Sequence, residues 1–225
     1  MVGNSVDVGL IEGLRPVECG NRSSCFELDD AVVLMRHGEP YRPAHLVDHK
    51  QNVRLLCALG CDRVIGFASV GSLRADIPPG TVVVPDDFFA PWSTPSFYED
   101  RRGHSSAGFH TPFRNRVLEA IRDFSPSLFR EGGVYAETRG PRFETPAEVR
   151  FLSQWAHVVG MTIASECVLC CEAGLAYAAV CSVDNYANGI AGELTLEAYE
   201  KSRADNLART TELLVRIAES LVGGP

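Results

Sequence analysis

The chain has little positive charge and no long apolar run, and each shortage excludes a class of function. Lysine and arginine number 21 against 29 aspartate and glutamate residues, so the formal net charge is −8. No basic stripe is present, and phosphate backbones need clustered cations, so we expect no nucleic-acid partner. No apolar run approaches the roughly 20 residues that cross a bilayer. We therefore also expect no membrane partner.

The start of the sequence lacks the features of a targeting segment. Residues 1–7 show neither the charged nor the apolar part of a signal peptide, so we expect a cytoplasmic protein. Internal repeats and low-complexity tracts are absent as well. With 225 residues, 45% of them hydrophobic, the chain can bury one large core. These properties predict a single domain over residues 1–225.

Cysteine is present, but its spacing does not complete a metal site. Cys167 and the pair that follows it have half of a zinc-type spacing, and no second half follows at a workable distance. We therefore expect no metal. Six cysteines lie in apolar patterns where reduced thiols pack as small hydrophobic groups, namely Cys57, Cys61, Cys167, Cys170, Cys171 and Cys181.

Short β-branched runs alternate with helical patterns and predict an α/β fold. Several runs are apolar on both faces, which is typical of central, mostly parallel strands covered by helices. The expected strands are 31–35, 63–69, 81–85, 133–136, 157–161 and 176–182. The expected helices are 45–59, 112–124, 146–155, 165–173 and 196–222.

One long irregular stretch runs from Phe88 to Thr111 and is rich in proline, serine, glycine and aromatic residues. Irregular segments of this length usually carry function or form an interface. Little periodicity is present to bury the aromatic side chains inside the subunit, and a soluble monomer rarely exposes so many. A subunit contact is therefore expected through Phe88, Phe89, Trp92, Phe97, Tyr98 and Phe109.

The segment Gly-Pro-Arg-Phe-Glu-Thr at 140–145 offers an aromatic ring beside a carboxylate. Phe143 can stack on a planar base while Glu144 accepts a hydrogen bond from a ring N–H, which is the chemistry of purine recognition. The alternative is a turn in which Phe143 fills the core and a helix starts at Thr145. Spacing alone leaves both open.

Further polar residues follow two of the expected strands. Arg36 and His37 come after the first, where an arginine fork gives paired bonds to phosphate and a histidine adds a donor. Ala68 and Ser69 end the second, where backbone N–H groups and a hydroxyl can face an anion. A surface arginine and an ordinary turn are the plain alternatives.

Taken in order, these segments resemble the trimeric purine nucleoside phosphorylase and methylthioadenosine phosphorylase family over about residues 32–199. The resemblance implies a partly closed central sheet flanked by helices and a homotrimer or hexamer. It also implies cleavage of a purine nucleoside by inorganic phosphate, without any other cofactor. It rests on Arg36-His37-Gly38, Val70-Gly71-Ser72-Leu73 with Pro79-Gly80, residues 140–145, Gly160-Met161-Thr162 with Glu166, and Glu172-Ala-Gly174-Leu with Tyr177-Ala.

The resemblance also assigns residues to roles. It implies that phosphate is held by Arg36, His37, Ala68, Ser69 and Thr162, and that the nucleoside is held by Phe143, Glu144, Met161 and Asn185.

The base preference depends on two positions. The family carries Asp for 6-aminopurines and Asn for 6-oxopurines after a late strand. Our alignment puts Asn185 there, with Asp184 one residue ahead, and a one-residue shift would exchange the two catalytic candidates. Glu144 can accept from the N1–H that only a 6-oxopurine has. Both positions therefore favour 6-oxopurines.

One departure keeps two alternatives open. The family begins with a Gly-Gly-Ser/Thr-Gly loop whose hydroxyl binds phosphate, and residues 8–14 have no hydroxyl at that point. Related nucleosidases use a glutamate there and a late aspartate, so Glu12 with Asp184 would give hydrolysis instead. The nucleosidases lack the segments at Arg36 and 140–145, so phosphorolysis is favoured. A noncatalytic purine-binding relative is the third possibility.

The group at the 5′ position of the sugar stays open between hydroxyl and methylthio. In the methylthio enzymes a histidine from a neighbouring subunit lies near this group. His104 and His110 are in the long irregular stretch, but neither aligns without a gap.

Overall fold

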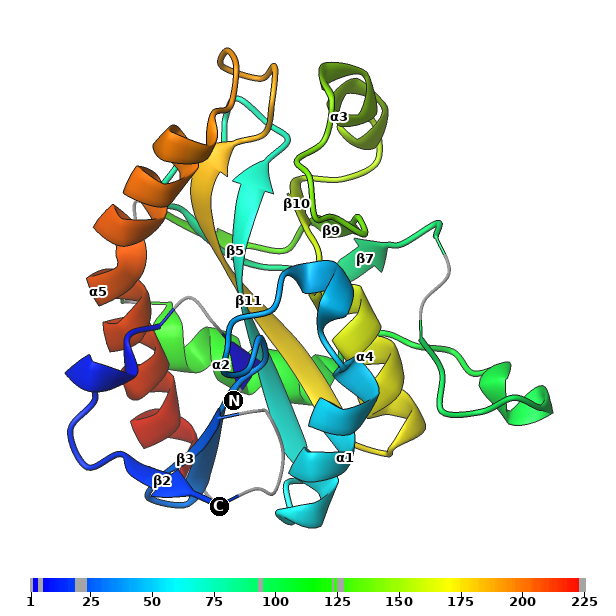
Figure 1. Ribbon diagram of the computed structural model, residues 1–225, viewed down its shortest axis with the longest axis vertical. Coiled ribbons are helices and arrows are strands. Elements are labelled where there is room, and N and C mark those ends of the chain that lie inside the picture. Colours follow the sequence, from blue (N-terminus) through cyan, green and yellow to red (C-terminus); the bar gives the residue numbers. More distant parts are fainter. Residues whose placement is uncertain are drawn as a thin grey trace.

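The computed structural model describes residues 2–3, 6–18, 24–92, 95–122, 124 and 128–222. Two long parallel strands, β5 (Arg63–Ser72) and β11 (Ala176–Tyr186), form its centre (Figure 1). The other strands are β1 (Val2–Gly3), β2 (Arg15–Val17), β3 (Ser24–Leu28), β4 (Ala31–Met35), β6 (Val82–Val84), β7 (Asp87–Phe89), β8 (Phe129–Glu131), β9 (Val134–Glu137) and β10 (Val158–Gly160). The α-helices are α1 (His49–Ala58), α2 (Thr111–Ile121), α3 (Pro146–Leu152), α4 (Ile163–Glu172) and α5 (Leu196–Val222).

The sheet branches at β5, which pairs with β11 along one edge and with β1 and β10 along the other. The main path runs β2-β3-β4-β1-β5-β10-β9-β7, and β11 continues to β6 and β8. Parallel pairs join β1, β4, β5 and β11, whereas β10 runs antiparallel to β5. The expected α/β fold with a central sheet between helices is confirmed, and the sheet is curled and mixed, with antiparallel pairs also between β2 and β3, β3 and β4, and β6 and β11.

Residues of β5 alternate between two hydrophobic layers. Val64 and Ala68 pack with α1 and α4, whereas Ile65 and Phe67 pack with α2 and α5. Figure 1 shows α5 on one side of β5 and β11, with α1 and α4 on the other. Because helices cover both faces, β5 reads as a continuous apolar run in the sequence.

Most predicted boundaries lie within a few residues of the observed ones, and two are wrong in an informative way. The helix expected from residue 45 begins at His49, because Asp48 caps it by accepting from the Gln51 N–H at 2.9 Å. The strand expected to end at 182 continues to Tyr186, so Asp184 and Asn185 lie in β11 itself. The short strands β1, β2, β3, β7 and β8 were not predicted.

The long irregular stretch buries more of its aromatic residues than the sequence indicates. Phe88, in β7, packs edge-to-face on Phe109, whose ring lies 6.2 Å from that of Tyr177. Phe97 packs on the same core beneath Arg54. The expectation that the aromatic residues of this stretch find no partner inside the subunit is therefore wrong for Phe88, Phe97 and Phe109. Trp92 remains 45% exposed.

Candidate active site

A cavity of about 290 Å³ lies where β4, β5 and β11 end, beside the starts of α4 and α5. Chain segments far apart in sequence meet there. The expected residues that line it are Arg36, His37, Ala68, Ser69, Phe143, Glu144, Met161, Thr162 and Asn185. Asp184 and Glu12 are not part of the lining.

A β-bulge separates Asp184 from Asn185. Val183 pairs with Val70 and Asn185 with Gly71, so Asp184 is the extra residue of β11. The bulge leaves Asn185 in the cavity wall, with its Nδ2 donating to the Tyr186 carbonyl at 2.8 Å. The structure thus places Asn185 in the cavity lining and its neighbour Asp184 outside it, although a one-residue shift of the alignment would exchange them.

Asp184 is buried behind Ser69 and faces α5. Its carboxylate accepts from the Ser69 hydroxyl, from Ser182 Oγ at 3.2 Å and from Asn206 Nδ2 at 3.0 Å. Burial raises the pKa of Asp184, and these donors act in the opposite direction. These hydrogen bonds hold the Asp184 carboxylate against Ser69, outside the lining of the cavity.

Arg36 is almost fully buried, and most of its N–H groups donate hydrogen bonds to other residues of the protein. Its Nη2 donates to the carbonyls of Val2 at 2.6 Å and Phe67 at 2.5 Å, and its Nη1 donates to the Thr162 hydroxyl. Nε lies 3.0 Å from Oε1 of Glu166 without the alignment of a hydrogen bond. The Arg36 guanidinium therefore forms a buried ion pair at the cavity floor.

His37 is stacked on Tyr41 and held neutral. The two rings lie 4.8 Å apart and nearly parallel. Burial, followed by the charge of Arg36, lowers the pKa of His37 to about 4. Its Nδ1 lies 2.6 Å from the Arg42 carbonyl, which assigns the proton to Nδ1 and leaves Nε2 as an acceptor. An anion bound beside the ring would raise this pKa and restore the donor that the sequence predicted.

Side chains of β9 accept hydrogen bonds from the free N–H groups at the start of α4, a feature that the sequence did not reveal. The Tyr135 hydroxyl accepts from the N–H groups of Thr162 and Ile163 at 3.1 and 3.4 Å. The Glu137 carboxylate accepts from those of Ala164 and Ser165 at 2.6 and 3.1 Å. Burial raises the pKa of Glu137 to about 7. These contacts fix Thr162 at the cavity.

Phe143 and Glu144 lie in the loop before α3, as expected. The ring of Phe143 meets that of Tyr199 edge-to-face at 5.2 Å. Glu144 is 8% exposed, and its Oε1 accepts from Thr138 Oγ1 at 2.5 Å. The second carboxylate oxygen remains for a ligand. Thr145 caps α3 in a capping box with Glu148, which orients both residues before it.

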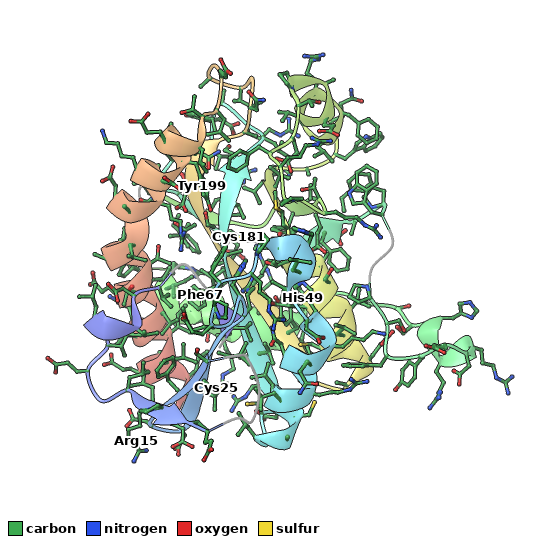
Figure 2. The ribbon with its side chains drawn as sticks, viewed as in Figure 1. Arg15, Cys25, His49, Phe67, Cys181 and Tyr199 are labelled. Atoms are coloured by element: carbon green, nitrogen blue, oxygen red, sulfur yellow. The ribbon has the colours of Figure 1, made fainter. Side chains whose placement is uncertain are left out.

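The first turns of α5 form a cavity wall that sequence reasoning missed. Tyr199 and Arg203 line the cavity and lie one helical turn apart. Figure 2 shows Tyr199 on α5 and His49 at the start of α1, on opposite sides of the central strands. The sequence did hold a signal for this contribution: two large polar side chains lie on one face of the helix that follows Asn185.

Other predicted residues lie away from the cavity. Glu12 is exposed beyond a short 3-10 helix (Val8–Leu10), which gives no support to its pairing with Asp184. The first strand is β1, and residues 4 and 5, which follow it in the sequence, lie outside the described residues. His110 caps α2 by accepting from Phe113, near the amino ends of β5 and β11, and His104 is exposed.

Cys167, Cys170 and Cys171 lie on α4, and the cysteines of the described ranges form no disulfide with one another. In those same ranges no cluster of three metal-ligating side chains is found. No helix there is long and apolar enough to cross a bilayer.

Comparison with known proteins agrees with this geometry. The model of the phosphorylase superfamily matches residues 11–219. A probable 6-oxopurine nucleoside phosphorylase of Archaeoglobus fulgidus is 36% identical over 82% of this chain and 70% of its own length. A probable S-methyl-5′-thioinosine phosphorylase of Methanocaldococcus jannaschii is 36% identical over 72% of this chain, and the chain spans only 66% of that protein.

A solved structure shares the fold. Methylthioadenosine phosphorylase from Schistosoma mansoni, in complex with tubercidin, superposes with a TM-score of 0.80 at 22% identity, over all of this chain and 91% of the other. The likeness confirms the architecture of the sheet and its helices. Since the family model covers nearly the whole sequence and the relatives align across most of it, the chain belongs to the phosphorylase superfamily.

Proposed function

We propose that the protein cleaves purine nucleosides with inorganic phosphate, and that it prefers 6-oxopurine bases. One observation carries the proposal: a single cavity combines anion-binding groups with an aromatic ring, a carboxylate and an amide suited to a 6-oxopurine. The names of the Archaeoglobus and Methanocaldococcus relatives support the same base class.

In this reaction the two substrates meet at C1′ of the sugar. A phosphate oxygen forms the new bond to C1′ while the C1′–N9 bond breaks, and the purine leaves with the bonding pair. Arg36, His37, Ala68, Ser69 and Thr162 hold the phosphate. By fixing the attacking oxygen beside C1′, these groups turn the encounter of the two substrates into an oriented, effectively unimolecular step. The purine then takes a proton from solvent, and ribose 1-phosphate remains.

The nucleoside is held on three sides. Phe143 stacks on the base, and the free oxygen of Glu144 accepts from N1–H. The second N–H of the Asn185 amide donates to N7, where negative charge develops as the bond breaks. Met161 covers the sugar. Asp184 acts one step away, by holding Ser69 in place.

The proposal also covers location, assembly, cofactors and the sugar. The protein works in the cytoplasm, in purine salvage, as a homotrimer or hexamer. It needs no metal and no organic cofactor, and it binds no nucleic acid. The Methanocaldococcus relative's name supports a 5′-methylthio sugar, whereas the Archaeoglobus name leaves the sugar open.

A substrate panel tests the proposal. Inosine, guanosine, methylthioinosine and methylthioadenosine are each incubated with and without phosphate, and release of free base is measured. We expect phosphate-dependent release from the 6-oxopurine nucleosides. Preference for methylthioadenosine would reverse the base assignment, and absence of turnover with all four would contradict the activity.

A further inference from the structure

Asn188 joins two chain segments that meet at the cavity. It lies between β11 and α5, and its side chain is half-buried. Its Nδ2 donates to the Glu144 carbonyl at 3.2 Å, and its Oδ1 accepts from the Leu194 N–H at 3.3 Å. The reverse orientation of the amide would set oxygen against oxygen and N–H against N–H, so these two bonds fix the orientation. One side chain therefore ties the loop at 140–145 to the segment that leads into α5.

The residues on either side of Asn188 are themselves anchored. Ala187 is buried, and its N–H donates at 2.8 Å to the carbonyl of Ser72, the last residue of β5. Gly189 lies so close to Pro146, the first residue of α3, that an added Cβ would lie 3.2 Å from Pro146 Cβ. Its φ of +89° is also one that residues with a side chain rarely adopt. Asn188 is thus held between two fixed neighbours, and its amide can support the loop at 140–145.

Glu144 is restrained at both ends by this arrangement. Its carboxylate oxygen Oε1 accepts from Thr138 Oγ1 at 2.5 Å, and its backbone carbonyl accepts from Asn188. Phe143, the residue before it, meets Tyr199 of α5 edge-to-face at 5.2 Å. Two consecutive residues of the loop are therefore held by the part of the chain that follows β11. A hydrogen bond weakens steeply as its angle departs from linear, so the position of this backbone decides what the carboxylate can reach.

We propose that Asn188 is a positioning residue for the purine base, acting through Glu144. The inference rests on the proposed function, in which the free oxygen of Glu144 accepts from N1–H of a 6-oxopurine. Asn188 is not part of the cavity lining, whereas its two partners, Glu144 and Leu194, belong to it. Loss of the donor to the Glu144 carbonyl should let the carboxylate move out of line with N1–H. The groups proposed for phosphate are fixed by contacts that do not include Asn188.

The test compares Asn188→Asp and Asn188→Ala with Glu193→Gln, a change at an exposed residue of the same segment. Asn188→Asp keeps an acceptor for the Leu194 N–H and removes the donor to Glu144, whereas Asn188→Ala removes both. Loss of this hydrogen bond should raise the inosine KM about 3- to 10-fold and lower the ratio of inosine to adenosine kcat/KM to a similar extent. The phosphate KM should stay within about twofold, and so should every constant of Glu193→Gln.

A double-mutant cycle separates positioning from a general loss of structure. With Glu144→Ser already present, Asn188→Ala should change the inosine KM by less than about twofold, because its effect runs through the missing carboxylate. A full effect of Asn188→Ala in that background overturns the proposal. An unchanged inosine KM in both single variants also overturns it, even where their urea midpoints fall.

Calorimetric titration with hypoxanthine and adenine decides the case in which the unaltered protein cleaves no nucleoside. Hypoxanthine bound about 3- to 10-fold more weakly by folded Asn188→Asp, with adenine binding unchanged, supports the positioning role although phosphorolysis fails. Equal hypoxanthine affinity in the two proteins overturns the role. Absence of hypoxanthine binding to the unaltered protein overturns the role and the base assignment together.

Discussion

Asn185 and Glu144 reach the cavity from different segments, and each contributes part of the base preference. Glu144 is buried with one oxygen occupied by Thr138, and Asn185 has one N–H occupied by the Tyr186 carbonyl. Each side chain therefore keeps a group for the base: an oxygen of Glu144, and the second N–H of Asn185 besides its Oδ1. A mismatched base would leave that group unpaired, at about 1–3 kcal/mol per position.

Exchange of these two side chains should reverse the preference. We expect Asn185→Asp with Glu144→Ser to shift the ratio of kcat/KM from inosine towards adenosine by about 10- to 1000-fold, from two such mismatches. Steady-state kinetics with both nucleosides measures this ratio, and the single variants show how each position contributes. An unaltered protein that already favours adenosine would return the role to Asp184.

Glu137 links pH to stability through the start of α4. Its pKa is about 7 in the folded protein against 4.5 ordinarily, so the folded state holds the proton more tightly. The stabilisation is complete below about pH 4.5 and is lost as the pH rises towards 7. The unfolding free energy should therefore fall over this window, by an amount on the order of 2–3 kcal/mol.

Urea unfolding between pH 5 and 7.5 measures this slope. Glu137→Gln keeps one acceptor and removes the titration, so its stability should depend less on pH than that of the unaltered protein. Burial also raises the pKa of Glu166 and Asp184, so part of the slope remains. The exposed Glu200→Gln is the control. Equal slopes for Glu137→Gln and the unaltered protein would show that Glu137 does not titrate in this range.

Among the helices and strands, hydrophobic periodicity was sufficient to predict those elements that bury one continuous face in the core. The boundaries of α5 and β4 were predicted as observed, and the starts of β5 and β11 were correct, but both of these central strands continue beyond their predicted ends. The Asp184 bulge was not predictable, because it depends on the register between β11 and β5. The part of α5 that lines the cavity was not predictable either. It is held there by the hydrogen bonds of Ser202 and Asn206 to Asp184, which form only when the helix packs on β11.

Gly66 is the point in β5 where Tyr177 and Ile163, in the hydrophobic layer of α1 and α4, leave no room for a side chain. A Cβ there would lie 1.9 Å from the Tyr177 hydroxyl, which donates to Glu166 at 2.7 Å and so supports the partner of Arg36. Gly66→Ala should destabilise the protein by about 2–4 kcal/mol and weaken phosphate use. Gly108→Ala, with no atom within 4 Å of an added Cβ, is the control. Equal urea midpoints for the two variants would contradict this packing account.

At the scale of the whole molecule, the proposed trimer rests on the family resemblance and on the surface that the long irregular stretch leaves open. Trp92 is 45% exposed although its Nε1 donates to the Glu137 carbonyl at 2.7 Å. It also lines a hollow that shares Ala44 and Met161 with the cavity, so a neighbouring subunit docked there would reach the site.

Activity should then depend on association. Specific activity is measured over a dilution series alongside the mass from light scattering, and both should fall together. His110→Ala or His104→Ala should change selectivity at the sugar 5′ position more than the phosphate KM. A monomer with full activity would disprove both the oligomer and the shared site.

The central claim is that phosphate, and not water, attacks C1′ in the cavity floored by Arg36. It is tested most directly by identifying the sugar product of inosine cleavage with ³¹P NMR, in phosphate buffer and in phosphate-free buffer. We predict ribose 1-phosphate, formed in equal amount to hypoxanthine, and no cleavage without phosphate. Free ribose released at an undiminished rate in phosphate-free buffer would contradict the account.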